Sequence, residues 1–219
     1  METNCDRYMK RALSILLLVT GAAAANAQFD EKNAIYFSNE FNMGGYAGVD
    51  ISLNYVYDTR FAFRVGFSGN TRIARTLPSD YSPGVVGILT LGVNTPRDNF
   101  QSVHFTFGYI QKLSESGTVR LNLSLGLGYA MTREPVNWQK IDQFLSENYT
   151  WDYEHNNSIS FVLNPKFEFP FSRYYGLSIS PMVEIYDGGT FFAVGIGHIF
   201  GLLRGSTPTA GTPAIKAVE

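Results

Sequence analysis

The longest alternating stretch of the chain, residues 117–132, restricts its possible folds more than any other feature. Its odd-numbered positions from Val119 to Met131 hold large apolar side chains, and its even-numbered positions hold polar or very small ones. Successive strand side chains point to opposite faces, so this pattern predicts a strand with one apolar and one polar face. At about 3.3 Å per residue the stretch would extend about 50 Å. It is longer than a transmembrane strand needs to be, because roughly 9–11 residues suffice for a tilted strand to cross a bilayer. We interpret it as a membrane strand whose apolar face contacts lipid.

The composition agrees with a membrane barrel. The 219 residues include 17 Phe, 13 Tyr and 21 Gly, and only 16% of them are charged. Barrel strands are half polar, so a barrel is not expected to contain a long apolar run. A membrane helix needs an apolar run of roughly 18 residues, and no run of that length occurs after position 30. The formal net charge of −2 is too small to indicate nucleic acid as a partner. The single cysteine, Cys5, excludes a disulfide framework.

The beginning of the chain resembles an export signal. Lys10 and Arg11 precede an apolar run at 12–19, and Ala25 and Ala27 form a small-x-small cleavage site. This order predicts a secretory signal peptide over residues 1–27, whereas an N-terminal membrane anchor would need a longer apolar core. The barrel is then expected over residues 28–202. Residues 203–219, rich in Thr, Pro, Ala and Gly, are expected to form a disordered periplasmic tail.

Seven further segments repeat the alternation, at 33–42, 46–57, 61–70, 103–109, 159–169, 175–185 and 191–200. Counting all eight segments in chain order, the connections after the second, fourth and sixth are short. Two long intervals, 73–99 and 133–157, fall on the other side of the sheet. This sorting is typical of an up-and-down antiparallel transmembrane barrel. We therefore predict an all-β barrel of about eight strands. Residues 84–93 could be a strand, a helix or a plug. As a strand they would be the ninth, and the barrel would then require a tenth strand.

The last strand carries a family resemblance. Gly195 stands five residues before the terminal aromatic Phe200. With its alternating strands, the chain resembles the small outer-membrane β-barrels of Gram-negative bacteria, the OmpX-like and OmpA-transmembrane-domain-like group. The resemblance implies a location in the bacterial outer membrane, contact with its lipid, and assembly by the barrel-assembly machinery through Gly195 and Phe200. The chain departs from that group at His198, where a bulky apolar residue is usual, and by continuing past Phe200.

Nine ionisable residues fall on the polar face of the predicted strands. An eight-stranded barrel is only wide enough for its own side chains, and buried charges need partners. We therefore predict a network of ion pairs that closes the lumen, with a narrow pore or small-ligand channel as the alternative. Strand direction places four of the nine toward the periplasm, Arg64, Arg120, Lys166 and Glu168, and five toward the outside, Glu40, Asp50, Arg72, His104 and Glu184.

The second long interval carries aromatic residues among mixed charges. Exposed aromatic side chains are typical of recognition surfaces. They could instead fold back as a cap over the barrel, and residues 139–145 could form a short helix. The interval therefore predicts either a binding site for an extracellular ligand or protein, or a cap, made by Trp138, Phe144, Tyr149, Trp151 and Tyr153.

A lipid A-modifying outer-membrane enzyme is a second alternative function. Ser102 could act as the nucleophile and His104 as the base, with Glu184 or Asp50 as the orienting carboxylate. Ser102 and His104 would face the lumen, which a lipid cannot readily reach, and the motif G-x-S-x-G is absent. We expect no cofactor. Three scattered histidines, and no cysteine after Cys5, also argue against a metal site.

Overall fold

The computed structural model describes residues 33–89, 95–114, 117–141 and 145–203. The predicted signal peptide, Phe144 and almost all of the predicted tail therefore lie outside the described residues. The helix in the described part of the chain is α2 (Gly84–Leu89). No helix among the described residues is long and apolar enough to span a membrane.

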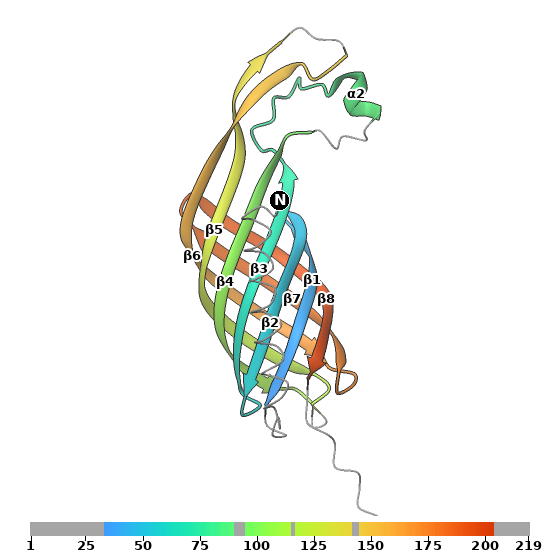
Figure 1. The fold of residues 1–219 in the computed structure, drawn as a ribbon, viewed down its shortest axis with the longest axis vertical. Coiled ribbons are helices and arrows are strands. Elements are labelled where there is room, and N and C mark those ends of the chain that lie inside the picture. The colour runs from blue at the N-terminus through green and yellow to red at the C-terminus, as the bar shows by residue number, and fades with distance from the viewer. Residues whose placement is uncertain (1–32, 90–94, 115–116, 142–144, 204–219) are drawn as a thin grey trace, which may run out of the picture.

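Eight antiparallel strands form one closed barrel, in which each strand pairs with the next and β8 pairs with β1 (Figure 1). The predicted fold class is therefore confirmed. The strands are β1 (Ala34–Gly44), β2 (Ala47–Tyr57), β3 (Phe61–Ile73), β4 (Arg97–Lys112), β5 (Arg120–Lys140), β6 (Tyr149–Phe169), β7 (Tyr175–Tyr186) and β8 (Gly189–Leu202).

The two faces of the barrel wall differ as the alternation predicts. On the exterior, Phe105, Leu127 and Phe161 are cross-strand neighbours in one row, and all three are exposed. The residues between them on the interior face, such as Thr106 and Ser160, are buried. An apolar exterior of this extent is unfavourable in water and favourable against acyl chains.

Local backbone chemistry explains the tight connections. Asp58 and Thr59 have φ angles of 50° and 58°, and the Arg60 amide donates to the Tyr57 carbonyl at 3.1 Å. Positive φ at both central residues defines the type I′ turn, whose twist matches that of the flanking strands. Within the wall, Gly126 allows a close approach between strands, because a Cβ there would lie 2.0 Å from the Phe105 carbonyl oxygen.

The prediction of a loop over residues 133–157 is wrong. β5 and β6 extend through most of this interval and pair as far as Lys140 and Tyr149, whereas β4 leaves β5 at Arg133. The alternation that marks the membrane strands is lost in β5 beyond Arg133, whereas in β6 the aromatic and polar residues of 149–154 still alternate. Gln139 and Lys140 belong to β5, so a helix beginning at residue 139 is also wrong.

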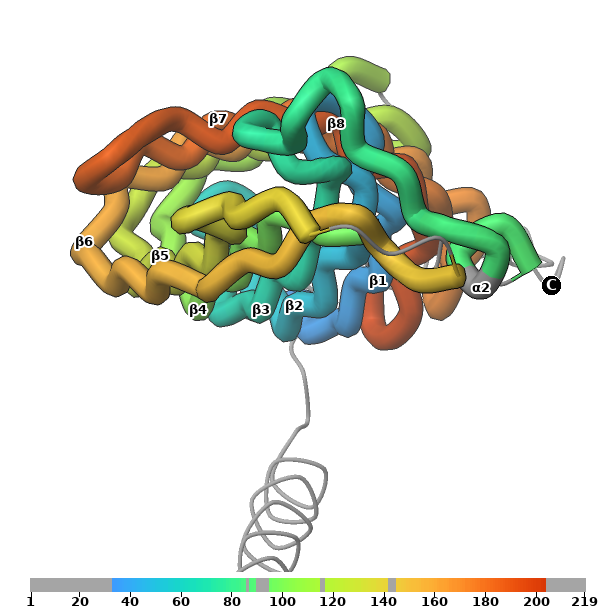
Figure 2. The backbone as a smooth tube through the Cα atoms, turned by 90° about the horizontal axis from the view of Figure 1, so that it is seen from above, coloured from blue at the N-terminus to red at the C-terminus, as the bar shows by residue number. Residues whose placement is uncertain are grey.

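The first long interval contains α2, which makes residues 84–89 a helix rather than a strand. Seen from above in Figure 2, the β5–β6 hairpin crosses over the ring of strands, and α2 lies near its tip. We call the hairpin beyond the ring (residues 134–140 and 149–158), with the connecting residues 145–148 and the segment 74–89, the arm. The barrel end that carries it is the arm end, and the opposite end is the base.

Candidate functional site

The barrel interior near the base is lined by apolar side chains around one ion pair. Arg120 Nε lies 2.5 Å from Glu168 Oε2, and both side chains are almost completely buried. The Tyr36 hydroxyl donates to the other oxygen of Glu168 at 2.7 Å, and Arg120 Nη1 donates to the Leu203 carbonyl at 2.8 Å. The surrounding apolar residues are Ala34, Tyr36, Val56, Ala62, Ile110, Ile199 and Leu203.

Two further ion pairs occupy the middle of the interior. Lys166 Nζ lies 2.7 Å from Glu40 Oε1, which also accepts a hydrogen bond of 2.6 Å from Ser178. Arg64 Nη2 lies 2.5 Å from Asp50 Oδ1, and Arg64 Nη1 also donates to Asn164. The sequence placed Lys166 and Arg64 nearer the base than their partners. That placement used only the position of each residue along its strand. The long side chains of Lys166 and Arg64 extend along the barrel and reach their partners.

Glu184 and His104 belong to the interior set without a close ion pair. Ser102 and Ser160 donate to Glu184 Oε1 at 2.6 and 2.5 Å, and the described residues give this carboxylate no cationic partner. His104 Nε2 lies 3.6 Å from Asp50 Oδ2, beyond hydrogen-bond distance. Its ring is seated on Gly66, where a Cβ would lie 2.3 Å from Nε2.

The geometry does not provide the enzyme alternative with a working pair. A Ser nucleophile needs a hydrogen bond to its base. Ser102 donates to Glu184, and neither ring nitrogen of His104 has a hydrogen-bond partner among the described residues. Ser102, His104 and Glu184 are also buried inside the barrel.

An aromatic layer, which sequence reasoning missed, occupies the interior at the arm end. Phe100 and Phe191 stack with centroids 4.5 Å apart and an interplanar angle of 7°, and Tyr46 packs against Phe191 at 5.6 Å. Phe191 could have been found, because it adjoins Phe192 and two large neighbours in a strand cannot both face lipid. The remaining buried members are Ala130, Val162, Met182 and Ala193.

Arg72 is placed with this aromatic layer rather than with the other interior charges. Its guanidinium carbon lies 4.2 Å from the centroid of the Tyr46 ring, and Arg72 Nε lies 2.8 Å from Asp98 Oδ2. Arg72 Nη2 also lies 3.8 Å from Glu134 Oε1, at the start of the arm. The sequence analysis missed Asp98, which is the close carboxylate partner of Arg72.

The two long connections are joined by a group of polar contacts that we call the latch: Asp80, Lys140, Asn148 and Tyr149. Asp80 accepts from Lys140 Nζ at 2.6 Å and from the Tyr149 hydroxyl at 2.7 Å. Asn148 donates to the Asp80 carbonyl at 2.9 Å and accepts from the Ser82 amide at 2.6 Å. The hydrogen bonds from Lys140 and Tyr149 lower the pKa of Asp80, and the bond between Tyr149 and Asp80 raises the pKa of Tyr149.

Three of the predicted surface aromatics come together on the arm. Trp138 packs against Trp151 at 5.4 Å and against Tyr149 at 6.3 Å. Tyr81, from the other long connection, completes the cluster at 6.3 Å from Trp138 and 6.5 Å from Trp151. No local pattern marked Tyr81 in the sequence. Tyr153 lies apart from this cluster, below the guanidinium of Arg133 at 3.7 Å.

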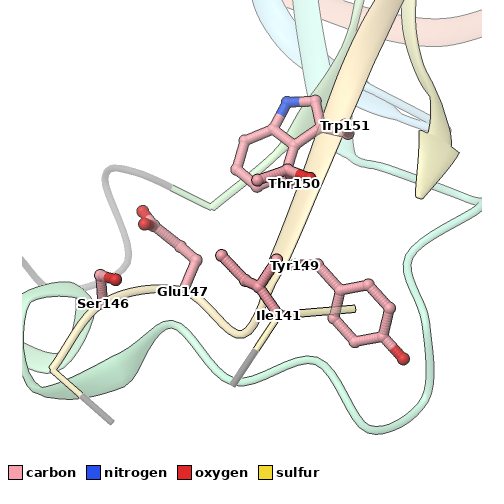
Figure 3. Close-up of a pocket in the computed structure, with 6 residues that line it drawn as sticks. All are labelled: Ile141, Ser146, Glu147, Tyr149, Thr150 and Trp151. Carbon is pink, nitrogen blue, oxygen red and sulfur yellow. The ribbon is translucent and has the colours of Figure 1, made fainter. Parts of the chain in front are cut away.

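A cleft of about 340 Å³ borders this aromatic cluster (Figure 3). Trp151 and Glu147 lie on neighbouring sides of it, and the described residues provide Glu147 with no salt-bridge partner. Burial raises the pKa of Tyr81, and the negative charge of Glu147 raises it further. The cleft is lined by Ile141, Ser146, Glu147, Tyr149, Thr150 and Trp151.

The two residues of the predicted assembly signal lie on opposite faces of β8. Gly195 faces the interior, where a Cβ would lie 3.1 Å from Glu40 Oε2. Phe200 is exposed on the exterior and packs against Tyr175 at 5.3 Å. His198 shares this exterior patch, with Nδ1 2.9 Å from the Tyr175 hydroxyl.

The closed ring of eight strands, with an apolar exterior and a polar interior, defines the class of protein. It is a small transmembrane β-barrel of the bacterial outer-membrane type. No protein-family model matches the sequence, and no curated protein matches it.

Three solved structures are similar to the chain in the arrangement of their strands, and each comparison covers 77% of this chain. The attachment invasion locus protein Ail of Yersinia pestis is 14% identical, over 95% of its chain, with a TM-score of 0.41. The N-terminal β-barrel domain of Pseudomonas aeruginosa OprF is 10% identical, over 96% of its chain, with a TM-score of 0.44. A major outer membrane protein of Thermus thermophilus is 14% identical, over 99% of its chain, with a TM-score of 0.47.

Proposed function

We propose that this protein is an outer-membrane anchor that presents the arm at the cell surface to bind an extracellular ligand, and that its barrel is closed to solutes. One observation carries the proposal: the two long connections combine into a single latched structure beyond the ring of strands. A barrel with only a structural role would not need such an arm.

The interior favours a closed barrel over the narrow pore. The ion pairs of Lys166 with Glu40 and of Arg64 with Asp50 are almost completely buried. The apolar group at the base lies on one side of them, and the aromatic layer of Phe100 and Phe191 lies on the other. An ion crossing the barrel would have to separate these packed layers and lose most of its hydration, which is strongly unfavourable.

The cleft on the arm suits a cationic ligand group. A tryptophan face attracts a cation with about 0.5–1 kcal/mol at an exposed site, and a nearby carboxylate adds a charge-assisted hydrogen bond. Trp151 and Glu147 supply both to the cleft. An arginine side chain of an extracellular protein has the required charge and planar shape.

The binding test uses the full chain folded in detergent micelles and a fluorescent arginine-rich peptide. Substituting Glu147→Gln is expected to weaken peptide binding about three- to tenfold, as losing about 1 kcal/mol would. Glu154→Gln is the matched control, because Glu154 is exposed on the same hairpin and does not line the cleft. Equal losses in both variants would contradict a specific cleft.

A second test addresses the closed barrel. The folded protein is expected to give no single-channel conductance in planar bilayers, while its unboiled and boiled forms migrate differently on SDS gels. Stable conductance steps from folded protein would favour the pore instead.

The assembly machinery also enters as a proposal. Phe200 and Gly195 lie on the closing strand β8, which pairs with β1 to complete the ring. We expect Phe200→Ala to lower the amount of folded protein in cells, measured by heat-modifiable migration. Phe192→Ala, on the exterior of the same strand, serves as the control.

A further inference from the structure

A polar border interrupts the apolar exterior of β4, β5 and β6 where the hairpin leaves the ring. The lowest of three cross-strand rows is apolar and exposed, the middle row is mixed, and the upper row is polar or charged. From the lowest row upward, they are Val103–Tyr129–Ile159, Gln101–Met131–Asn157 and Asn99–Arg133–His155.

Charges at this border are sorted by face. Arg97 lies two residues from Asn99 on β4, and Arg97, Arg133 and His155 all share the exterior face and are exposed. The neighbouring carboxylates Asp98, Glu134 and Glu154 alternate with them and therefore point to the opposite face. Among the described residues of these rows, the exterior border thus carries basic, neutral polar and apolar side chains and no carboxylate.

Arg133 is held in place without losing its hydrogen-bonding edge. Its guanidinium carbon lies 3.7 Å from the centroid of the Tyr153 ring. Stacking uses the face of the guanidinium and leaves its N–H groups free to donate in the plane. Among the described residues, neither Arg133 nor Arg97 forms a salt bridge, so their charges remain available.

The two upper rows enclose a cleft of about 290 Å³, and all six of their residues line it. Below it lie the exposed apolar side chains that face acyl chains. A group bound in this cleft would therefore sit at the height of the lipid head groups, directly above the acyl chains of the same lipid.

We propose that this cleft binds the phosphate of an anionic lipid in the membrane leaflet on the arm side. Phosphate matches the donors present, because guanidinium groups bind it through paired N–H···O bonds and side-chain amides add further donors. The inference rests on the proposed placement in the outer membrane. This cleft is separate from the arm cleft, and its proposed ligand is an anion, whereas the proposed ligand of the arm cleft is a cation.

The test measures lipid binding to the full chain in detergent micelles by native mass spectrometry. Phosphorylated lipid A is compared with dephosphorylated lipid A that has the same acyl chains. We expect at least about tenfold tighter binding of the phosphorylated form, because hydrogen bonds to a charged group are stronger than those between neutral groups. Arg133→Gln should remove most of this preference, and Arg97→Gln a smaller part.

Arg173→Gln is the matched control, because Arg173 is an exposed arginine in the turn between β6 and β7 at the base. It should leave the preference unchanged. Equal binding of both lipids, or an equal loss in Arg173→Gln, would overturn the proposal. Saturation by inorganic phosphate at the lipid's own affinity would also overturn it, since the site would then serve a soluble anion.

The same preparations separate this proposal from the proposed function. Heat-modifiable migration and binding of the arginine-rich peptide should be unchanged in Arg133→Gln, because Arg133 does not line the arm cleft. If the wild-type protein does not bind the arginine-rich peptide, the arm proposal is contradicted, while the lipid result is unaffected.

Discussion

One ion pair in the barrel interior and one on the arm have nearly equal geometry. Lys166 and Glu40 are 2.7 Å apart with side chains 1% and 2% exposed, whereas Lys140 and Asp80 are 2.6 Å apart with side chains 58% and 51% exposed. A charge left alone in the interior cannot regain water, but a charge left alone on the arm can. The environment, more than the distance, decides what each pair contributes.

The largest effect is expected from breaking the interior pair. Lys166→Met leaves the Glu40 carboxylate buried without its partner, which should lower the free energy of unfolding by about 3–5 kcal/mol. Urea unfolding of the barrel in micelles, followed by gel migration, measures the change.

A double variant sharpens this result. Lys166→Met with Glu40→Gln should recover a substantial part of the loss, because no buried charge is then left unpaired. If the double variant is as unstable as the single one, packing rather than charge explains the effect.

A smaller effect is expected in the aromatic layer at the arm end. Phe100→Leu shortens a side chain that is completely buried against Phe191. It should cost about 1–3 kcal/mol of unfolding free energy, from lost apolar burial and a small cavity. The same variant should remain non-conducting in planar bilayers, because the layers below are intact. Conductance would show that this layer alone closes the barrel.

The smallest effect on the barrel, confined to the arm, is expected from the latch. Asp80→Asn should leave the urea midpoint of the barrel unchanged but increase hydrogen exchange of the arm amides. Protease cleavage within the arm should rise in parallel. A shifted barrel midpoint would show that the arm and the ring unfold together.

Acid and alkali should open the latch at opposite ends of the pH scale. The pKa of Asp80 is lowered from 3.8 in the folded state, so its contribution is present above that value and is lost as the pH falls through the folded pKa. The pKa of Tyr149 is raised from 10.0, so its contribution is present below that value and is lost as the pH rises through the folded pKa. Between these limits, the protection of the arm amides relative to their intrinsic exchange rates should respond little to pH.

The contrast between the two regions also explains what the sequence could predict. In the barrel wall each residue faces either lipid or the interior, and this two-way choice is visible as alternation, as in residues 117–132. On the arm the pattern is lost in β5 beyond Arg133, but it continues in β6, where aromatic and polar residues alternate over 149–154. Partners far apart in sequence, such as Tyr81 with Trp138, depend on how the connections fold over each other. The aromatic layer was missed for a different reason, since its members occupy positions that the alternation assigns to polar residues.

One irregular residue decides which side of the arm carries its aromatic cluster. The pairing of β5 with β6 slips by one residue between Val136 and Gln139, where Asn137 has a φ of 56°. If the unchanged sequence paired without this slip, strict alternation would place Trp138 on the face of Val136, away from Trp151. Because lateral pairing with β4 ends at Arg133, such slips can be gained or lost there without disturbing the ring. The arm is thus a place where a one-residue insertion or deletion can exchange an entire recognition surface while the membrane anchor stays the same.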